Sequence, residues 1–316
     1  MAIYVSGSLA FDRIMTFDGN FQDHVLMDKL HTLSVSFMVD NMNELRGGCA
    51  GNIAYTLALL SEKPLIVASA GRDFAGYAAA LEEMGLSTEG IRRDADVFTA
   101  LCYITTDRNN NQITGFYPGA MSLPASYDFP HLDPASDWAI VSPGNLEDMR
   151  RLPRFFREKG VRYIYDPGQQ LPVLSAADLL DAITGSYACV TNDYEIGMVC
   201  KTTGKSEEEL LQLTGWLVTT LGAKGQRIRN AQGVDMHIPA IACQDVKDPT
   251  GAGDSHRSGL LKGLSRGLSM PEAAKVGAVS ACYAIEQLGT QAHHFSYDQF
   301  RRRYEEAFGP LPAALA

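Results

Sequence analysis

Residues 138–168, WAIVSPGNLEDMRRLPRFFREKGVRYIYDPG, contain one complete step of the pattern that predicts the fold. An apolar strand over Trp138–Val141 ends in a Pro-Gly turn, a charged helix over 147–159 is closed by Gly160, and a second strand follows over 163–165. The same order of strand, turn and helix recurs along most of the chain. Because helices that alternate with short apolar strands cover a parallel sheet, the sequence predicts an α/β fold with helices on both faces.

The remaining elements of this pattern predict where a ligand binds. Strands are expected over 3–7, 65–69, 188–191 and 216–220, and further helices over 74–84 and 176–183. Ligands of such sheets bind beyond the carboxyl ends of the strands. Each expected strand ends in turn or polar residues, so we expect the functional side chains at that edge.

Two segments interrupt the pattern. Residues 11–45 contain strand-like pieces at 13–17 and 31–37, and residues 98–118 have the pattern of a β-hairpin. A hairpin does not fit a βα repeat, so we interpret both segments as a small β lid over the main sheet, with two irregular surface loops as the alternative. Since no linker or shift in composition marks a second domain, residues 1–316 are expected to form a single large α/β domain.

Composition and charge restrict the class of protein. The 316 residues are 46% hydrophobic, which excludes a disordered chain. Lys plus Arg is 27 and Asp plus Glu is 37, so the net charge is −10, which argues against nucleic-acid binding and against adsorption to an anionic membrane. No run approaches the ~18 apolar residues of a membrane span, and the N-terminus does not resemble a signal peptide.

The cysteines indicate the compartment. They are scattered, without a CxxC pair, so we expect free thiols in a cytoplasmic protein and neither a disulfide scaffold nor a zinc site. The six are Cys49, Cys102, Cys189, Cys200, Cys243 and Cys282.

Several common signatures are missing from the sequence. It contains no strand-linked GxGxxG, no GxxxxGK[ST], no GxSxG and no HExxH. Their absence weakens the interpretations as a Rossmann dehydrogenase, a P-loop enzyme, an α/β-hydrolase or a zinc protease.

The strongest motif is Asp248-Pro-Thr-Gly-Ala-Gly-Asp254, which precedes an amphipathic helix. Glycines at a helix start let backbone N–H groups point at a ligand, and the positive end of the helix dipole favours an anion there. Asp254, in the first helical turn, is ionised at neutral pH and can accept the proton of an attacking hydroxyl, which is the base role in phosphoryl transfer. A helix cap without chemistry is the alternative.

A second glycine-rich motif, Arg46-Gly-Gly-Cys-Ala-Gly-Asn52, also leads into a helix. Gly48 and its neighbours permit close backbone approach to a ligand, and Asn52 offers a donor and an acceptor, which suits vicinal hydroxyls. Asp12, after the first strand, can bind paired hydroxyls through both oxygens. The alternatives are tight helix–strand packing for the glycines, a cap for Asn52 and a solvated turn for Asp12.

Two further strand ends carry polar residues or glycines. Asn192 and Glu195 can hold water around Mg²⁺ beside a triphosphate, or they form a helix-capping pair. Thr220, Gly222 and Gly225 follow another strand and can border a nucleotide, with a simple β-turn as the alternative.

Taken together, these motifs resemble the ribokinase-like (PfkB) family of carbohydrate kinases across almost the whole chain. Gly47-Gly48 with Gly51-Asn52 is similar to the family's N-terminal signature, and Asp248–Asp254 is similar to its C-terminal one. Within the family, Arg46–Leu60 and Gln112–Ala120 look most like bacterial adenosine kinases.

The resemblance implies a three-layer α/β/α fold with a mostly parallel central sheet and a β-sheet lid formed by 11–45 and 98–118. It implies ATP with Mg²⁺ as the phosphoryl donor and a nucleoside or sugar as the acceptor. Asp254 matches the family's catalytic base, and the backbone amides of Gly251, Ala252 and Gly253 match its anion hole.

Other site residues follow from the same resemblance. The residues that match acceptor-binding positions are Asp12, Gly48 and Asn52. The residues that match the ATP side are Asn192, Glu195, Thr220, Gly222 and Gly225, with Glu195 holding Mg²⁺ through water. Asp248 and Thr250 lie where a K⁺ site is expected in family members that need this ion.

The resulting hypothesis is transfer of the ATP γ-phosphoryl group to a primary alcohol, the 5′-hydroxyl of adenosine, by a cytoplasmic monomer or homodimer. Alternatives are the same fold acting on ribose, a hexose or many nucleosides, and a non-catalytic ligand-binding protein on this fold. An apolar slot for a nucleobase can come from Phe37, Leu101, Phe116 and Tyr117, which can equally be lid core.

One departure from the family pattern lies beside the proposed base. In Asp254-Ser-His256-Arg-Ser258, His256 stands where family members usually carry a packing aromatic. We expect the ring to pack against the sheet as that aromatic does, with altered or weakened activity as the alternative.

Overall fold

The larger of two sheets forms the centre of the protein. The computed structural model describes residues 1–24, 36–109 and 111–315. Its nine-stranded sheet has the order β13-β12-β11-β10-β9-β8-β1-β4-β5. The strands are β1 Ile3–Ser6, β4 Leu65–Ala70, β5 Ile91–Arg93, β8 Trp138–Val141, β9 Arg162–Tyr165, β10 Ala188–Asn192, β11 Leu217–Thr220, β12 Gln226–Arg229 and β13 Asp235–Ile238. All pairings are parallel except those of β12 with β11 and with β13, so the predicted mostly parallel sheet is confirmed.

The central strands are apolar because both of their faces are covered. All four residues of β1 and of β8 are buried, and Val5 and Tyr4, which are adjacent in β1, belong to different hydrophobic clusters on opposite faces. Parallel strands covered on both faces have this continuous apolar pattern instead of an alternating one.

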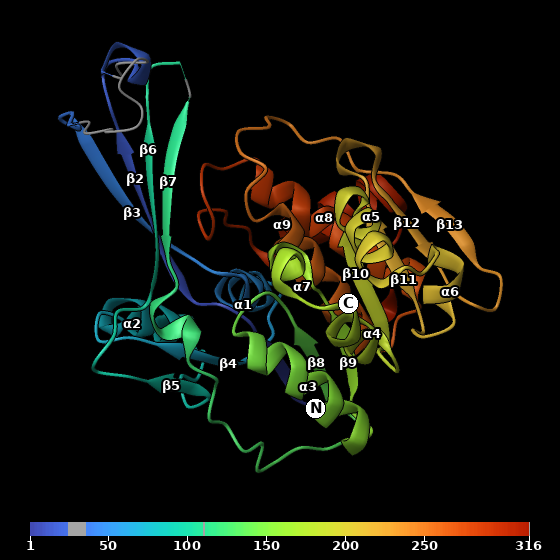
Figure 1. The fold of residues 1–316 in the computed structure, drawn as a ribbon. Coiled ribbons are helices and arrows are strands. Elements are labelled where there is room, and N and C mark those ends of the chain that lie inside the picture. Colours follow the sequence, from blue (N-terminus) through green and yellow to red (C-terminus); the bar gives the residue numbers. More distant parts are fainter. Residues whose placement is uncertain (25–35, 110, 316) are drawn as a thin grey trace.

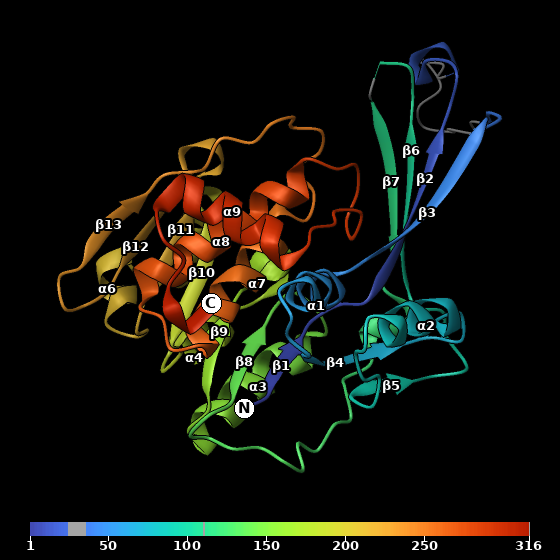
Figure 2. The same cartoon turned by 180° about the vertical axis from the view of Figure 1, so that it is seen from behind.

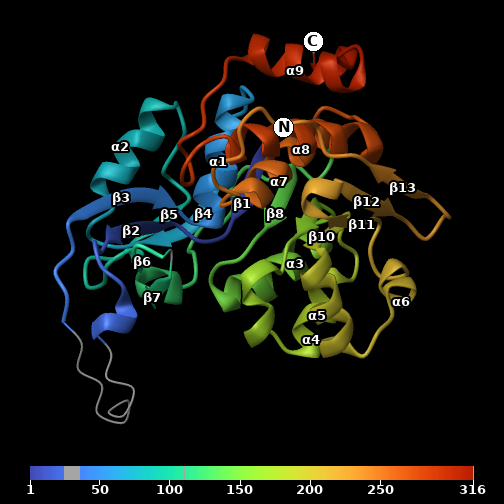
Figure 3. The same ribbon diagram turned by 90° about the horizontal axis from the view of Figure 1, so that it is seen from above.

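Helices form a layer on each face of this sheet (Figure 3). One face carries α1 Cys49–Leu59, α2 Ala75–Glu83, α7 Ala252–Ser265 and α8 Met270–Ile285, and α9 Tyr297–Phe308 packs on α8. The other face carries α3 Leu146–Lys159, α4 Ala176–Ile183, α5 Asp193–Thr203 and α6 Glu207–Leu211. The short 3₁₀ helices are η1 Phe21–His24, η3 Gly119–Ser122, η4 Gly168–Val173, η5 Gly222–Lys224 and η6 Ala313–Leu315. The predicted three-layer α/β/α arrangement is therefore confirmed.

A separate four-stranded sheet projects away from the main sheet (Figures 1 and 2). Its order is β3-β2-β6-β7, from β2 Ala10–Thr16, β3 Asn41–Gly47, β6 Ala100–Thr106 and β7 Gln112–Tyr117. The hairpin predicted over 98–118 is confirmed as the antiparallel pair β6 and β7. The central pair, β2 and β6, is parallel and joins the two interrupting segments into one sheet.

The strand predicted at 31–37 falls mostly on residues outside the described ranges. Residues 31–35 lie outside the described residues, and residues 36 and 37 belong to no strand. The strand that pairs with β2 is β3 instead. Its sequence, NMNELRG, is polar, and its first four residues are exposed, so no apolar pattern marks it as a strand.

The sequence pattern also does not reveal the edge of the main sheet. The β12–β13 hairpin is antiparallel and begins with QRIR, in which charged residues alternate with the rest. Among the described residues, no helix combines the length and apolarity needed to cross a membrane.

Candidate active site

Two cavities lie on the two sides of the turn that begins α7. A cavity of about 450 Å³, which we call the small cavity, is lined by Thr250, Gly251 and Asp254 together with residues of α1, η4 and the second sheet. A cavity of about 640 Å³, the large cavity, is lined by Ala252 and Gly253 together with β11, η5 and α8. One turn of the chain therefore contacts both spaces.

The turn owes its shape to Gly251 and Asp248. Gly251 has a φ of 78° in the left-handed region, and a Cβ on it would lie 3.1 Å from Thr290 Cγ2. Asp248 Oδ1 accepts from the Thr250 amide (2.9 Å) and Oδ2 from the Gly289 amide (2.8 Å). Burial alone would raise the pKa of Asp248, but these hydrogen bonds outweigh it and the pKa lies below its ordinary value. The predicted K⁺ role of Asp248 and Thr250 stays a prediction.

The start of α7 suits an anion. The first amides of a helix lack intrahelical partners, and the helix dipole places positive charge there. Of the three amides predicted to form the anion hole, that of Ala252 donates to the Pro249 carbonyl at 3.1 Å. The anion-binding role of Gly251, Ala252 and Gly253 stays a prediction.

Asp254 points from the first turn of α7 toward α1. Its Oδ2 accepts a hydrogen bond of 2.8 Å from Asn52 Nδ2. Burial raises the pKa of Asp254, while Asn52, the Arg257 guanidinium and Cys49 oppose the rise. The result is a buried carboxyl group at the wall of the small cavity, to which Asn52 donates.

Asn52 and Asp12 reach the same cavity from two directions. Gly48, the N-cap of α1, has a φ of 88°, and a Cβ on it would lie 2.7 Å from the amide nitrogen of Ala10. Only glycine allows α1 to begin this close to β2. A Cβ on Gly47 would lie 2.7 Å from Asp12 Oδ2, so this glycine leaves room for the carboxylate. Burial raises the pKa of Asp12.

Other walls of the small cavity were missed in the sequence. Gln169 and Gln170 of η4 line it, and Gln170 Nε2 donates to the Gly144 carbonyl at 2.8 Å. The sequence could have indicated them, because they follow the carboxyl end of β9 by a few residues. Ligands of parallel sheets bind at such strand ends. Cys102 and Met121 also line the cavity.

Only one of the four residues offered for an apolar slot lines the small cavity. Phe116 does so, whereas Leu101 is buried in the main hydrophobic cluster. Phe37 packs against Phe17, with ring centroids 4.7 Å apart, and Tyr117 is exposed.

The large cavity contains the third predicted glycine turn. Thr220, Gly222 and Gly225 line it, and most other lining side chains are small or apolar, on the connection from β13 to α7 and on α8. Gly225 has a φ of 93°, and a Cβ on it would lie 2.6 Å from the amide nitrogen of Ala240. The glycine therefore lets that connection lie against β11.

Asn192 and Glu195 form the capping pair that was the alternative interpretation. Asn192 Oδ1 accepts from the Glu195 amide (2.7 Å), and Glu195 Oε2 accepts from the Asn192 amide (2.8 Å). Neither is among the described residues that line the two cavities. Glu195 Oε2 also lies 3.9 Å from Arg257 Nη2. The nucleotide and Mg²⁺ roles of this pair stay predictions.

Arg257 was missed and is the buried cation of the site. Its guanidinium pairs with both oxygens of Asp166, one at 2.9 Å from Nη2, and a Cβ on Gly253 would lie 2.8 Å from Nη1. Burial raises the pKa of Asp166 to about 7, although Arg257 opposes the rise. A sequence signal existed: Arg257 follows Asp254 by three residues and therefore shares its face of the helix.

His256 packs as expected. It is buried on α7, and its Nε2 lies 2.8 Å from Gln226 Oε1 on β12. Burial lowers the pKa of His256 to about 3, so the ring is neutral at pH 7. The ring lines the large cavity.

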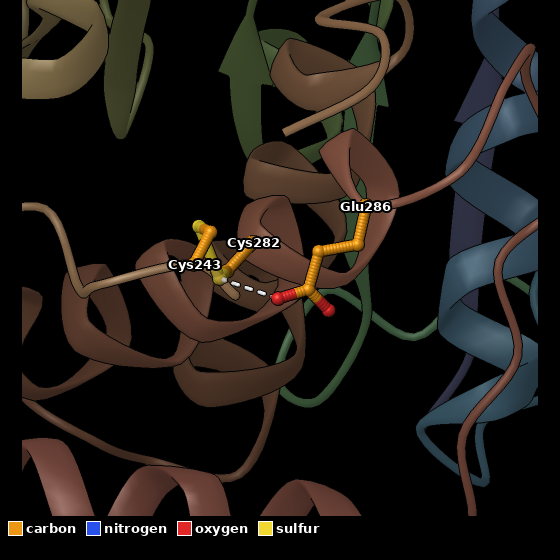
Figure 4. Close-up of side chains that lie close together, drawn as sticks. All are labelled: Cys243, Cys282 and Glu286. Atoms are coloured by element: carbon orange, nitrogen blue, oxygen red, sulfur yellow. Dashed lines mark hydrogen bonds between the residues drawn. A yellow bond between two sulfur atoms is a disulfide. The ribbon is translucent and has the colours of Figure 1, made fainter. Parts of the chain in front are cut away.

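The expectation of free thiols is wrong for two cysteines. Cys243 and Cys282, whose Cα atoms are 5.7 Å apart, form a disulfide at the wall of the large cavity, with Glu286 beside them (Figure 4). The pairing joins α8 to the connection between β13 and α7. The sequence does not reveal that these two segments lie close together. The other four cysteines, all in described ranges, are free.

Three comparisons relate this chain to known proteins. The family model described as pfkB family carbohydrate kinase matches residues 12–295. The nucleoside kinase of Methanothermobacter thermautotrophicus is 28% identical over 295 residues, which cover 92% of this chain and 94% of that protein. The structure of Burkholderia thailandensis nucleoside kinase in complex with inosine has a TM-score of 0.85 at 36% identity, covering 98% of this chain and 99% of that one. Its complex with ADP-inosine has a TM-score of 0.81 at 37% identity, covering 98% and 97%.

Proposed function

This chain belongs to the pfkB family of carbohydrate kinases, and we propose that it transfers the γ-phosphoryl group of ATP to the 5′-hydroxyl of a purine nucleoside, adenosine among them. The observation that carries the proposal is the pair of cavities on the two sides of the glycine turn that begins α7. Asp254 faces the small cavity, and Gly253 faces the large one. An acceptor and a donor seated there would meet at the start of α7.

The small cavity suits a nucleoside. Asp12 and Asn52 offer directed partners for ribose hydroxyls, and Phe116 with Gln169 and Gln170 supplies an apolar face and amide groups for a base. The solved structure that is similar over most of its length binds inosine, which supports a purine nucleoside over a free sugar.

The large cavity suits the nucleoside part of ATP. Its walls of alanine, isoleucine and valine can hold a flat ring, while the glycines at 222 and 225 allow close backbone approach. The related kinase with ADP-inosine supports ATP as the donor.

The reaction follows from the position of Asp254. As the nucleoside O5′ attacks the γ-phosphorus, its proton passes to the Asp254 carboxylate and the bond to the β-phosphate oxygen breaks, which releases ADP. The amides and dipole of α7, with Arg257 beneath Gly253, stabilise charge on the transferring group. Glu195 would hold a water ligand of the Mg²⁺ that accompanies ATP, and this ion would supply positive charge beside the phosphates.

The second sheet would act as a lid. Through Asp12, Cys102 and Phe116, it forms one wall of the small cavity. Closure over the acceptor would exclude water and limit hydrolysis of ATP.

The test is ADP release from MgATP with adenosine, inosine, ribose or fructose offered separately. We expect release with adenosine or inosine, and no release with the sugars at equal concentration. ADP release with a sugar alone would show that the acceptor is not a nucleoside, while phosphoryl transfer from ATP would still hold. Saturable nucleoside binding without ADP release would support a non-catalytic binding protein.

A further inference from the structure

Gln291 lies in the segment between α8 and α9, beside the start of α1. Its backbone has a φ of 56°, a left-handed conformation that residues with a Cβ rarely adopt. Its side chain is half-buried and reaches the residues behind the small cavity. Strained backbone at such a place suggests a function for the side chain that it presents.

The Gln291 amide donates two hydrogen bonds. Its Nε2 lies 3.0 Å from Asn52 Oδ1 and 2.5 Å from the hydroxyl oxygen of Tyr77. The Tyr77 hydroxyl donates to the Gly47 carbonyl at 3.0 Å, so the hydroxyl oxygen can accept the hydrogen bond from Gln291. Gln291 is therefore fixed by Tyr77 as a donor toward Asn52.

This donor determines which way the Asn52 amide faces. An asparagine amide has a donor end and an acceptor end that can exchange places by rotation. With Oδ1 occupied by Gln291, the other end, Nδ2, faces Asp254 Oδ2 at 2.8 Å. A rotated Asn52 amide would place its Oδ1 against the Asp254 carboxylate. Its Nδ2 would then face Gln291 Nε2, so that two donors would oppose each other.

We propose that Gln291 is a positioning residue for phosphoryl transfer: it holds the Asn52 amide in the orientation that donates to Asp254. The inference rests on the function proposed above, because Asp254 matters as a base only if the chain is a kinase. Gln291 is not among the described residues that line either cavity, so it acts through Asn52.

The consequence is a change in the pH profile. Burial raises the pKa of Asp254, and the Asn52 hydrogen bond lowers it. The other titratable groups that influence Asp254 are Arg257 on its own helix, Cys49 on α1, Glu195 on α5 and Asp166 after β9. Without the donor the pKa of Asp254 rises, so kcat/KM reaches its plateau only at a higher pH.

Two substitutions separate orientation from packing. Gln291→Glu keeps the size of the side chain but replaces the donor by an acceptor, which favours the rotated Asn52 amide. Gln291→Gly suits the backbone conformation and removes the side chain. We expect kcat/KM at pH 7 to fall about tenfold for Gln291→Gly and further for Gln291→Glu, with the acid limb moved to higher pH in both.

The matched control is Gln232→Glu, the same change on an exposed turn between β12 and β13, which should keep the wild-type profile. If the Gln291 variants are unstable, Tyr77→Phe removes the hydroxyl that fixes Gln291 and should move the acid limb in the same direction. Folded variants with a wild-type acid limb would overturn the inference. A wild-type chain inactive with every nucleoside would instead overturn the proposed function.

Discussion

The two cavities differ in the way their walls are built. The small cavity is lined by carboxylate and amide side chains from segments far apart in the chain, such as Asp12, Asn52, Gln169 and Asp254. The large cavity is lined mostly by glycines and small or apolar side chains around one strand end and one helix. Hydroxyls need directed partners, whereas a flat ring needs a slot and close backbone approach. The difference predicts that substitutions on the two sides affect different kinetic constants.

The largest expected effect is at the turn shared by the two cavities. Asp254→Asn keeps the shape of the side chain and removes its capacity to accept a proton. We expect kcat to fall about 10³-fold, while the Kd of the nucleoside changes little. The rate of ADP formation gives kcat, and calorimetry on the same preparation gives the Kd of the nucleoside. Near-normal turnover would show that another group is the base.

A smaller effect is expected at the wall of the small cavity. Asp12→Asn removes a charged acceptor for ribose hydroxyls, so KM for the nucleoside should rise about 10- to 100-fold. KM for ATP should stay near its wild-type value, because Asp12 does not line the large cavity among the described residues. An equal rise in both constants would argue against separate cavities.

The corresponding test on the donor side is a substitution that fills part of the large cavity. Ala281 of α8 lines it and is half-buried, so Ala281→Phe should raise KM for ATP about tenfold and leave KM for the nucleoside unchanged. Ala307→Phe, at an exposed position of α9, is the control for the added ring. A higher nucleoside KM in the Ala281 variant would show that the base, not the nucleotide, occupies this cavity.

The smallest effect concerns the cysteines of the two cavities. Cys49 and Cys102 of the small cavity are free, whereas Cys243 and Cys282 of the large cavity are paired. Thiol titration in denaturant should therefore find four reactive groups without reductant and six after reduction. Six groups before reduction would show that the pair is not formed in solution.

The same contrast explains how much of the site the sequence predicts. Gly48 with Asn52, Gly251 with Asp254, and Thr220 with Gly225 each lie within a few residues at one strand or helix end, so local sequence reveals them. The first and third of these turns each line one of the two cavities, and the turn that begins α7 lines both.

The pairing of residues that lie far apart in the sequence left no comparable signal. Arg257 and its partner Asp166 are 91 residues apart, and Gln291 and Asn52 are 239 apart, so only the packed sheet and helices bring them together. The fold followed the same rule. Apolar strands such as β8 were predicted from residues 138–141, whereas the polar strand β3 was not.

The most direct test of the central claim is the position of the phosphate in the product. Wild-type protein is incubated with MgATP and adenosine or inosine, and the product is identified by phosphorus NMR. Asp254 at the junction of the two cavities predicts a single nucleoside 5′-monophosphate formed in equal amount to ADP. A phosphate on the 2′- or 3′-oxygen, or inorganic phosphate alone, would contradict the account.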